Sequence, residues 1–353
     1  RIGNILNVTD TDPSGILCLT YTEAGAVEMR KRLAKLINPQ VAYRIHIHTF
    51  HSFCNAVINE NREYFGGTFE LQAISELETV ELYYKLIDNF PADNCLKKYT
   101  GDVYSNLPRL KALFDYIKKE NIDPNLLMQK ADDYIAGLPE NPDYQYKKAN
   151  AAKGIKVGDP KMSAINAEVE KMDSLKAALC EFQNYQRLLA EAQRYDFNDM
   201  INWVIEAFKK HEGLLAKYQE RYLYFLVDEF QDTNGAQIEI LNLLTAFWEA
   251  PNLFAVGDDD QSIYSFQGAE NERIKEFVRK YADHLYPVVL TTNYRSTQQV
   301  LDLSSSLIEN NVSRLTNDLL LKSIFLQQNR KFHKNLKAHN TEKGNFAITE
   351  YFN

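Results

Sequence analysis

Three carboxylates follow one short apolar run in the stretch FLVDEFQDTN, residues 225–234. Asp228 and Glu229 come directly after the run, and Asp232 lies three residues further on. The first acid of such a pair can hold Mg²⁺, usually through water, and the second can orient or deprotonate an attacking water. An acid after a strand can instead cap the next helix, as Asp232 could for residues 233–244. The motif alone leaves both interpretations open.

Two further stretches place polar residues after apolar runs. VGDDDQSIYSFQGA (256–269) contains Asp258 and Gln261, and LTTNYRS (290–296) contains Tyr294 and Arg295. An arginine beside a transferring phosphate neutralises developing charge, which is worth about 10³ to 10⁵ in rate. A lone arginine is more often an ordinary surface salt-bridge partner. Together, the three stretches favour a site for magnesium and nucleotide phosphate.

The elements that must position these residues alternate between strands and helices. Apolar, β-branched runs predict strands at 15–22, 43–49, 222–229, 252–258 and 286–292, and helical spacing predicts helices at 23–37 and 50–61. This rhythm predicts an α/β fold, a parallel sheet with helices on both faces. Because ligands bind at the carboxyl ends of such strands, we expect the acids to gather at one edge.

The middle of the chain has a different pattern. From 76 to 193 the apolar spacing is helical and predicts no strand, and a loop rich in Pro, Gly and Lys (137–161) interrupts it. We therefore expect an all-helical subdomain at 76–193, inserted into a sheet domain formed by 1–75 and 194–285. Residues 286–353, with a last strand near 345–352, would begin a further domain that cannot bury its own faces.

Composition bounds the class of protein. The 353 residues carry a net charge of −8, so a nucleic-acid site must be a local patch. The cysteines at 18, 54, 95 and 180 form no CxxC pair, which indicates free thiols in a cytoplasmic protein rather than zinc or disulfides. His46 and His48 share a strand face, but no acid or cysteine completes a metal set. No apolar run is long enough for a membrane span.

The motifs resemble those of superfamily 1 DNA helicases of the UvrD/Rep/PcrA type. LTYTEAGAVEMRKRL, HTFHSF, LVDEFQDTN, VGDDDQSIYSFQGA and LTTNYRS stand in that family's order and spacing, and RYDFNDMI (194–201) resembles a weaker element. The resemblance implies a RecA-like P-loop NTPase sheet with an inserted helical subdomain. It also implies an ATP-dependent helicase or translocase that moves on single-stranded DNA and unwinds duplex, uses ATP and Mg²⁺, and acts in DNA repair or recombination.

The resemblance also assigns roles to residues of the nucleotide site. Asp228 matches the family's magnesium ligand, and Glu229 matches the residue that activates the hydrolytic water. Gln261 matches a glutamine that senses the γ-phosphate. Tyr294 matches a tyrosine that stacks on adenine, and Arg295 matches an arginine that reaches the γ-phosphate from the second motor domain. We expect ATP to close a cleft between two motor domains.

On the DNA side, Tyr21, Tyr264 and Phe266 occupy family positions whose aromatics stack on bases, worth about 1–3 kcal/mol per base. Thr49 and His51 match positions near the DNA backbone. For each of these aromatics, packing in the hydrophobic core is the alternative to stacking on a base. The stretch departs from the family at Glu23, which replaces an asparagine, at Ala24, which replaces a lysine, and at Ser265 and Gln267, which stand where basic residues are common. Glu23 adds a carboxylate near the DNA backbone, and the changes at Ser265 and Gln267 remove positive charge, so we expect weaker DNA binding there.

A P-loop is missing from the sequence, which contains no Gly-Lys pair. The chain opens on Arg1 rather than Met, so we expect a fragment whose P-loop lies upstream, and whose remaining motifs lie beyond Asn353. Such a chain should by itself bind ATP poorly and hydrolyse it negligibly. Three alternatives remain: the motor part of a helicase–nuclease, a non-catalytic DNA- or partner-binding scaffold, and a metal-dependent nuclease. The nuclease would use Asp228, Glu229, Asp232 and Asp258 directly.

Overall fold

The computed structural model describes residues 1–97, 101–149, 154–261, 271–311 and 314–339, so the strand expected near 345–352 lies outside the described residues. The chain divides into two compact units. The first comprises Arg1–Thr49, Lys217–Asn234 and the described residues from Leu244 onward, and the second comprises Phe50–Ala216 and Gly235–Leu243.

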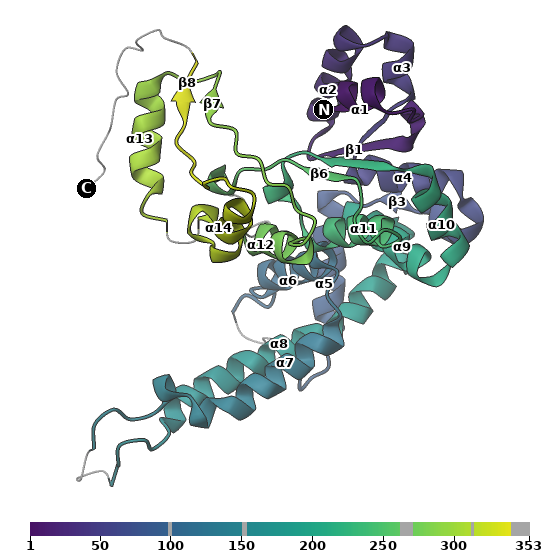
Figure 1. Ribbon diagram of the computed structural model, residues 1–353. Helices are drawn as coiled ribbons and strands as arrows, with labels where there is room; N and C mark the ends of the chain where they lie inside the picture. The colour runs from purple at the N-terminus through teal and green to yellow at the C-terminus, as the bar shows by residue number, and fades with distance from the viewer. Residues whose placement is uncertain (98–100, 150–153, 262–270, 312–313, 340–353) are drawn as a thin grey trace. The chain divides into compact units, whose positions relative to one another are not determined.

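A four-stranded parallel sheet forms the centre of the first unit (Figure 1). Its strands, in the spatial order β2-β1-β5-β6, are His46–Thr49, Ile16–Thr20, Tyr224–Val227 and Leu253–Ala255. The predicted parallel sheet among helices is therefore confirmed. Val227 pairs with Leu19 on one side and with Ala255 on the other. This register brings the loops after β5 and β6 to the same edge of the sheet.

Helices α1 (Ile2–Val8), α2 (Glu23–Leu36) and α3 (Pro39–Arg44) share a core with β1 and β2 through Ile16, Cys18 and Ile47. β1 is buried at all five positions, as expected of a strand covered on both faces. The strand predicted at 43–49 begins too early. Pro39 starts α3 there, and the Asn38 side chain accepts from the Gln40 backbone N–H, so α3 runs to Arg44 before β2 begins.

The remaining elements of the first unit include a second, smaller sheet. They are α12 (Asn271–Lys280), β7 (Thr292–Asn293), α13 (Gln298–Ile308), α14 (Leu319–Gln327) and β8 (Lys337–Ala338). β7 pairs in parallel with β8. The strand predicted at 286–292 is wrong except for its last residue. Pro287 has no N–H to donate to a ladder, and β8 offers only two partner residues.

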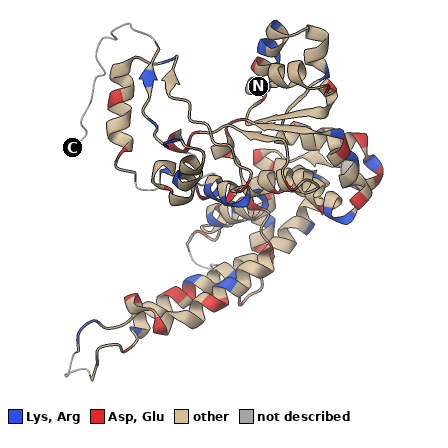
Figure 2. Cartoon of the chain, in the orientation of Figure 1, with Lys and Arg blue, Asp and Glu red and all other residues tan. Residues whose placement is uncertain are grey.

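The second unit is mainly helical. Its helices include α4 (Phe50–Glu60), α5 (Glu76–Asp88), α6 (Leu107–Glu120), α7 (Pro124–Gly137), α8 (Met162–Glu191) and α9 (Phe197–Lys210). Two short parallel strands, β3 (Gln72–Ala73) and β4 (Arg194–Tyr195), flank the helical range. α7 and α8 lie side by side (Figure 1), and charges of both signs are interspersed along them (Figure 2). No helix in the described ranges combines the length and apolar character needed to cross a bilayer.

An aromatic core and one buried charge hold this unit together. Tyr83, Phe114, Phe182 and Tyr185 pack between α5, α6 and α8. The side chain of Lys118, in α6, is only 2% exposed. Its ammonium pairs with Asp196 and Asp199, the two aspartates of the α9 capping box, at 2.6 and 2.7 Å. A charge buried this deeply is tolerated because both aspartates compensate it.

Candidate active site

The turn after β5 gives the two adjacent acids different environments. The Asp228 N–H donates to the Leu19 carbonyl at 2.9 Å, which extends the ladder by one residue, and the Asp228 side chain is half-buried. Glu229 then adopts a left-handed conformation, with φ 51° and ψ 47°, and is exposed. A left-handed glutamate is strained, and such strain is concentrated at functional sites. α10 (Glu212–Arg221) precedes β5 in the chain, and α11 (Gly235–Thr245) follows the turn.

We call Asp228, Glu229 and Asp232 the β5 acids. Burial and the neighbouring Glu229 charge raise the pKa of Asp228 and the pKa of Asp232 above the usual range. In the described part of the chain, no lysine or arginine pairs with any of the three. A half-buried carboxylate beside an exposed one, with neither paired to a cation among the described residues, is a suitable place for a hard divalent cation with oxygen ligands. Asp228 therefore fits the magnesium ligand expected from the sequence.

Gln231, a residue that no sequence motif marked in advance, connects this turn to the next strand. Its side chain is 3% exposed. The Nε2 amide donates to Glu229 Oε2 at 2.8 Å, and Oε1 accepts from the Asp258 backbone N–H at 3.0 Å. A Cβ on Gly257 would lie 2.9 Å from Gln231 Oε1, so a larger residue at this position would displace the Gln231 amide. The feature of the sequence that could have indicated this role is the position of the glutamine between two acids, directly after a strand.

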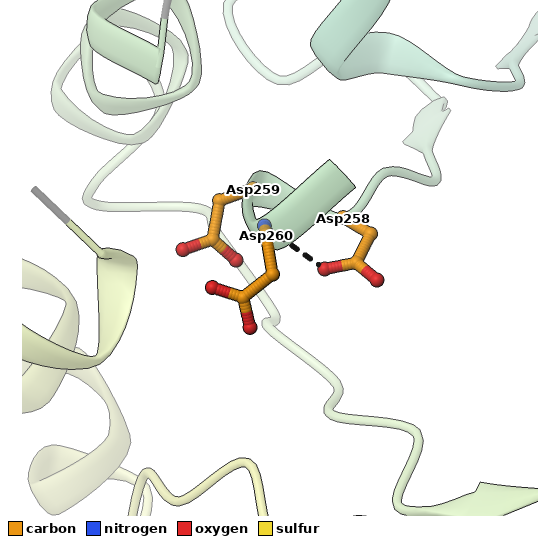
Figure 3. Close-up of side chains that lie close together, drawn as sticks. All are labelled: Asp258, Asp259 and Asp260. Atoms are coloured by element: carbon orange, nitrogen blue, oxygen red, sulfur yellow. Dashed lines mark hydrogen bonds between the residues drawn. The ribbon is translucent and has the colours of Figure 1, made fainter. Parts of the chain in front are cut away.

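A second acidic group follows β6. Asp258, Asp259 and Asp260, which we call the aspartate triplet, present their carboxylates close together (Figure 3). Unlike the β5 acids, this group is paired with cations: Lys334 contacts all three aspartates, and Arg314 pairs with Asp260 at 2.7 Å. Among the described residues, cations therefore pair with the aspartate triplet but not with the β5 acids.

The expected phosphate sensor lies beside the aspartate triplet. Gln261 is exposed, and its Nε2 donates to Asp258 Oδ2 at 2.6 Å. Since the Asp258 N–H is held by Gln231, and Gln231 also holds Glu229, one chain of hydrogen bonds joins the β5 and β6 turns. The structure therefore brings Asp228, Glu229 and Gln261 to one edge of the sheet.

The NYRS stretch forms a local turn. Asn293 Oδ1 accepts from the backbone N–H groups of Arg295 and Ser296, at 2.9 and 2.7 Å, a turn that asparagine favours. Tyr294 is 74% exposed, with its ring 4.7 Å from that of His339, and Arg295 is exposed. Among the described residues, neither side chain hydrogen-bonds or ion-pairs with the β5 acids or Gln261. The structure does not join them to the sheet edge.

The residues expected to contact DNA differ in their exposure and in their neighbours. Tyr21 directly follows β1 and is 39% exposed, whereas His51 lies in α4 with its ring edge-on to Phe197. Thr49 is buried, and its hydroxyl donates to Glu23 Oε1 at 2.8 Å. While Glu23 accepts this proton, Thr49 cannot donate it to a phosphate. Tyr264 and Phe266, as well as Ser265 and Gln267, lie outside the described residues.

Asp232, which could have capped the helix that follows it, does not do so, and another residue caps α11. The backbone N–H of Gly235, at the start of α11, donates to Glu120 Oε2 at 3.1 Å, and a Cβ on Gly235 would lie 2.6 Å from that oxygen. Asp232 instead ends the short 3₁₀ helix Phe230–Asp232 and accepts from Gln231 Nε2 at 3.3 Å. Glu120 therefore caps α11.

Comparison with known proteins identifies the family of the chain. A sequence model of the UvrD/REP helicase N-terminal domain matches residues 1–282. The chain is 30% identical over 327 residues to the ATP-dependent DNA helicase PcrA of Leuconostoc citreum, covering 90% of this chain and 36% of that protein. It is 29% identical to PcrA of Staphylococcus aureus over 315 residues (89% and 36%). It is also 29% identical over 338 residues to a probable DNA helicase II homolog of Mycoplasma capricolum (93% and 40%).

The chain thus spans well under half the length of these relatives. The family match nevertheless covers most of the chain, from its first residue to the end of α12, and includes both acidic turns of the sheet edge. The chain therefore belongs to the UvrD/REP helicase family, through its N-terminal domain.

Proposed function

We propose that the whole protein is an ATP-dependent DNA helicase that translocates on single-stranded DNA and unwinds duplex during DNA repair or recombination. The observation that carries this proposal is the uncompensated Asp228–Glu229 pair at the end of β5, held beside Gln261 by Gln231. The names of the relatives, ATP-dependent DNA helicases, support the same reaction and imply ATP and DNA as its ligands.

Each residue of the sheet edge has a role in this proposal. Asp228 would hold Mg²⁺, which when bound supplies charge neutralisation to the phosphate oxygens. Glu229 takes the proton of the attacking water or orients that water, and Gln231 fixes the direction of the Glu229 carboxylate by its hydrogen bond. Gln261 contacts the γ-phosphate. Tyr294 and Arg295 would stack on adenine and reach the γ-phosphate.

The proposed architecture follows the family. Residues 1–75 and 194–285 would form a RecA-like motor domain, with 76–193 as an inserted helical subdomain and 286–353 as the start of a second motor domain. Within 76–193 the described residues form α5 to α8, short 3₁₀ turns and one isolated bridge, in keeping with an all-helical insertion. We further propose a cytoplasmic location for an enzyme that acts on DNA.

The DNA contacts are also part of the proposal. Tyr21, His51, Tyr264 and Phe266 would line the path of single-stranded DNA. Thr49 would contribute only if its hydroxyl leaves Glu23. The direct-nuclease alternative is less favoured, because the Asp258 carboxylate is already bound to Lys334 and Gln261.

The test is hydrolysis of ATP by the whole protein, with and without single-stranded DNA. Glu229→Gln should lower kcat by at least about 100-fold, the usual contribution of a positioned base. Glu249→Gln, an exposed acid after α11, is the matched control and should retain full activity. Full ATPase activity in Glu229→Gln would refute the assignment. Cleavage of DNA with Mg²⁺ and no nucleotide would instead favour the nuclease.

A further inference from the structure

The aspartate triplet is bound by two cations that come from far along the chain. Lys334, whose side chain is 14% exposed, contacts Asp258 Oδ1 and lies 2.8 Å from Asp259 Oδ1 and 2.8 Å from Asp260 Oδ2. Arg314 makes a two-pronged contact with Asp260, at 2.8 and 2.7 Å. The Leu315 backbone N–H also donates to Asp259 Oδ2, at 2.7 Å. All three carboxylates are therefore held by the segment 314–334.

These contacts argue against a metal ion in the triplet. The carboxylate oxygens lie within 4.8 Å of one another, a spacing that could suit a cation (Figure 3). The Lys334 ammonium already contacts one oxygen of each residue. Although burial opposes its charge, the hydrogen bonds to the three aspartates outweigh burial and raise the pKa of Lys334. The ammonium therefore stays charged and acts as the cation of this group.

The segment that carries Lys334 is itself packed within the first unit. α14 buries Leu321, Ile324 and Phe325 in a core shared with Val278 of α12. Phe332, two residues before Lys334, stacks on Phe325 with ring centroids 4.9 Å apart. Lys334 is thus presented from a packed body, and its contact with the triplet links that body to the turn after β6.

Asp258 carries this contact to Gln261. Its Oδ1 binds Lys334 while its Oδ2 accepts from Gln261 Nε2, at 2.6 Å, so one carboxylate connects both side chains. Without the ammonium, Asp258 would carry an uncompensated charge beside Asp259 and Asp260. Repulsion among the three would then favour a different turn and a different position of Gln261.

We propose that Lys334 is a positioning residue for Gln261, and that its contact with the aspartate triplet couples the segment 314–334 to the phosphate-sensing turn. The inference rests on the proposed function, in which Gln261 contacts the γ-phosphate of ATP. Displacement of the 314–334 segment would remove the ammonium from the Asp258 carboxylate and thereby change the position in which that carboxylate holds Gln261.

A double-mutant cycle in the whole protein tests the inference through DNA-stimulated ATPase activity. Lys334→Met keeps the aliphatic stem but removes the charge, and should lower kcat about tenfold. Because Lys334 acts through Gln261, Lys334→Met should cause no further loss in a Gln261→Ala background. Losses that multiply in the double variant would overturn the inference, since a merely structural role predicts independence. Lys331→Ala, an exposed lysine of the same segment, is the control and should keep full activity.

Two further comparisons make each outcome decisive. If Lys334→Met does not fold, Lys334→Arg replaces it in the double-mutant cycle. The planar guanidinium cannot place its N–H groups where the compact ammonium contacts all three carboxylates. The kcat should therefore fall about threefold, again only when Gln261 is present. An unchanged kcat in Lys334→Arg would then overturn the inference. Glu229→Gln separates the two proposals. If it is inactive while both Lys334 variants are fully active, only the inference fails, whereas a wild-type protein without ATPase activity overturns both.

Discussion

Replacement of Gln231 by leucine should weaken the sheet edge by an amount that follows from its two hydrogen bonds. The bond to the Glu229 carboxylate is charge-assisted and contributes about 1.5–3 kcal/mol, while an Asp258 N–H left without an acceptor costs about 1–3 kcal/mol. Since Glu229 is exposed and water can replace part of its bond, we take the lower half of the sum. Gln231→Leu should therefore lower the free energy of unfolding by about 2.5–4 kcal/mol.

Gln231→Glu separates the two bonds. It keeps an acceptor for the Asp258 N–H but places a second carboxylate against Glu229, where the amide donor was 2.8 Å away. Repulsion raises the carboxyl pKa of this pair in the folded protein, so ionisation costs stability as the pH rises. The variant should be markedly less stable than wild type at about pH 8 and close to it at about pH 5, where the pair can share a proton.

Urea unfolding of the first unit measures both effects. The chain has two tryptophans, and Trp248 packs edge-to-face on Phe225 of β5, with centroids 6.2 Å apart. In a Trp203→Phe background, its fluorescence reports this unit alone. Gln40→Leu, on an exposed position of α3, is the control for a new leucine. A loss below about 1 kcal/mol in Gln231→Leu, or a Gln231→Glu loss independent of pH, would refute the reasoning.

Three further variants test other parts of the structure. Asp228→Asn should raise the melting temperature at neutral pH and abolish ATP hydrolysis by the whole protein. Because burial raises the pKa of Asp228 above 3.8, the stability gain should shrink toward about pH 4, and a lower melting temperature at pH 7 would contradict this. Lys118→Met should destabilise the second unit by about 3–5 kcal/mol in urea unfolding followed by Trp203 fluorescence, because two half-buried carboxylates lose their buried cation. Gly235→Ala should lower the free energy of unfolding by about 1–3 kcal/mol, because the added methyl group overlaps Glu120. An unchanged midpoint of urea unfolding would show instead that α11 shifts to accommodate the methyl group.

Sequence patterns located the strands of the main sheet better than those of the small second sheet. The apolar runs around Ile16, Phe225 and Phe254 became β1, β5 and β6, although only β1 is buried at every position. The run at 286–292 has the same composition but contains Pro287 and finds only two partner residues in β8. The length of the neighbouring strand depends on the assembled sheet, so a local sequence pattern does not reveal it.

The site shows the same division. Asp228 and Glu229 were recognisable because their types and their place after a strand are local features. Gln231 was not, since its role depends on the β5–β6 register that brings the Asp258 N–H to its amide. Lys334 was hidden for a similar reason: it is one of 40 lysines and arginines, and no local rule indicates which of them reaches the aspartate triplet.

The order of the strands along the chain has a consequence for synthesis of the protein. β1 ends at Thr20, and its central partner β5 begins at Tyr224, so a ribosome adding about 5–20 residues per second leaves β1 without that partner for roughly 10–40 s. The helices α5 to α8 lie between the two strands and share an aromatic core that needs neither. We expect the helical part to fold first on the nascent chain, with the open edge of β1 exposed to misassociation meanwhile. Asp228, the residue after β5, would reach its place only when that edge closes.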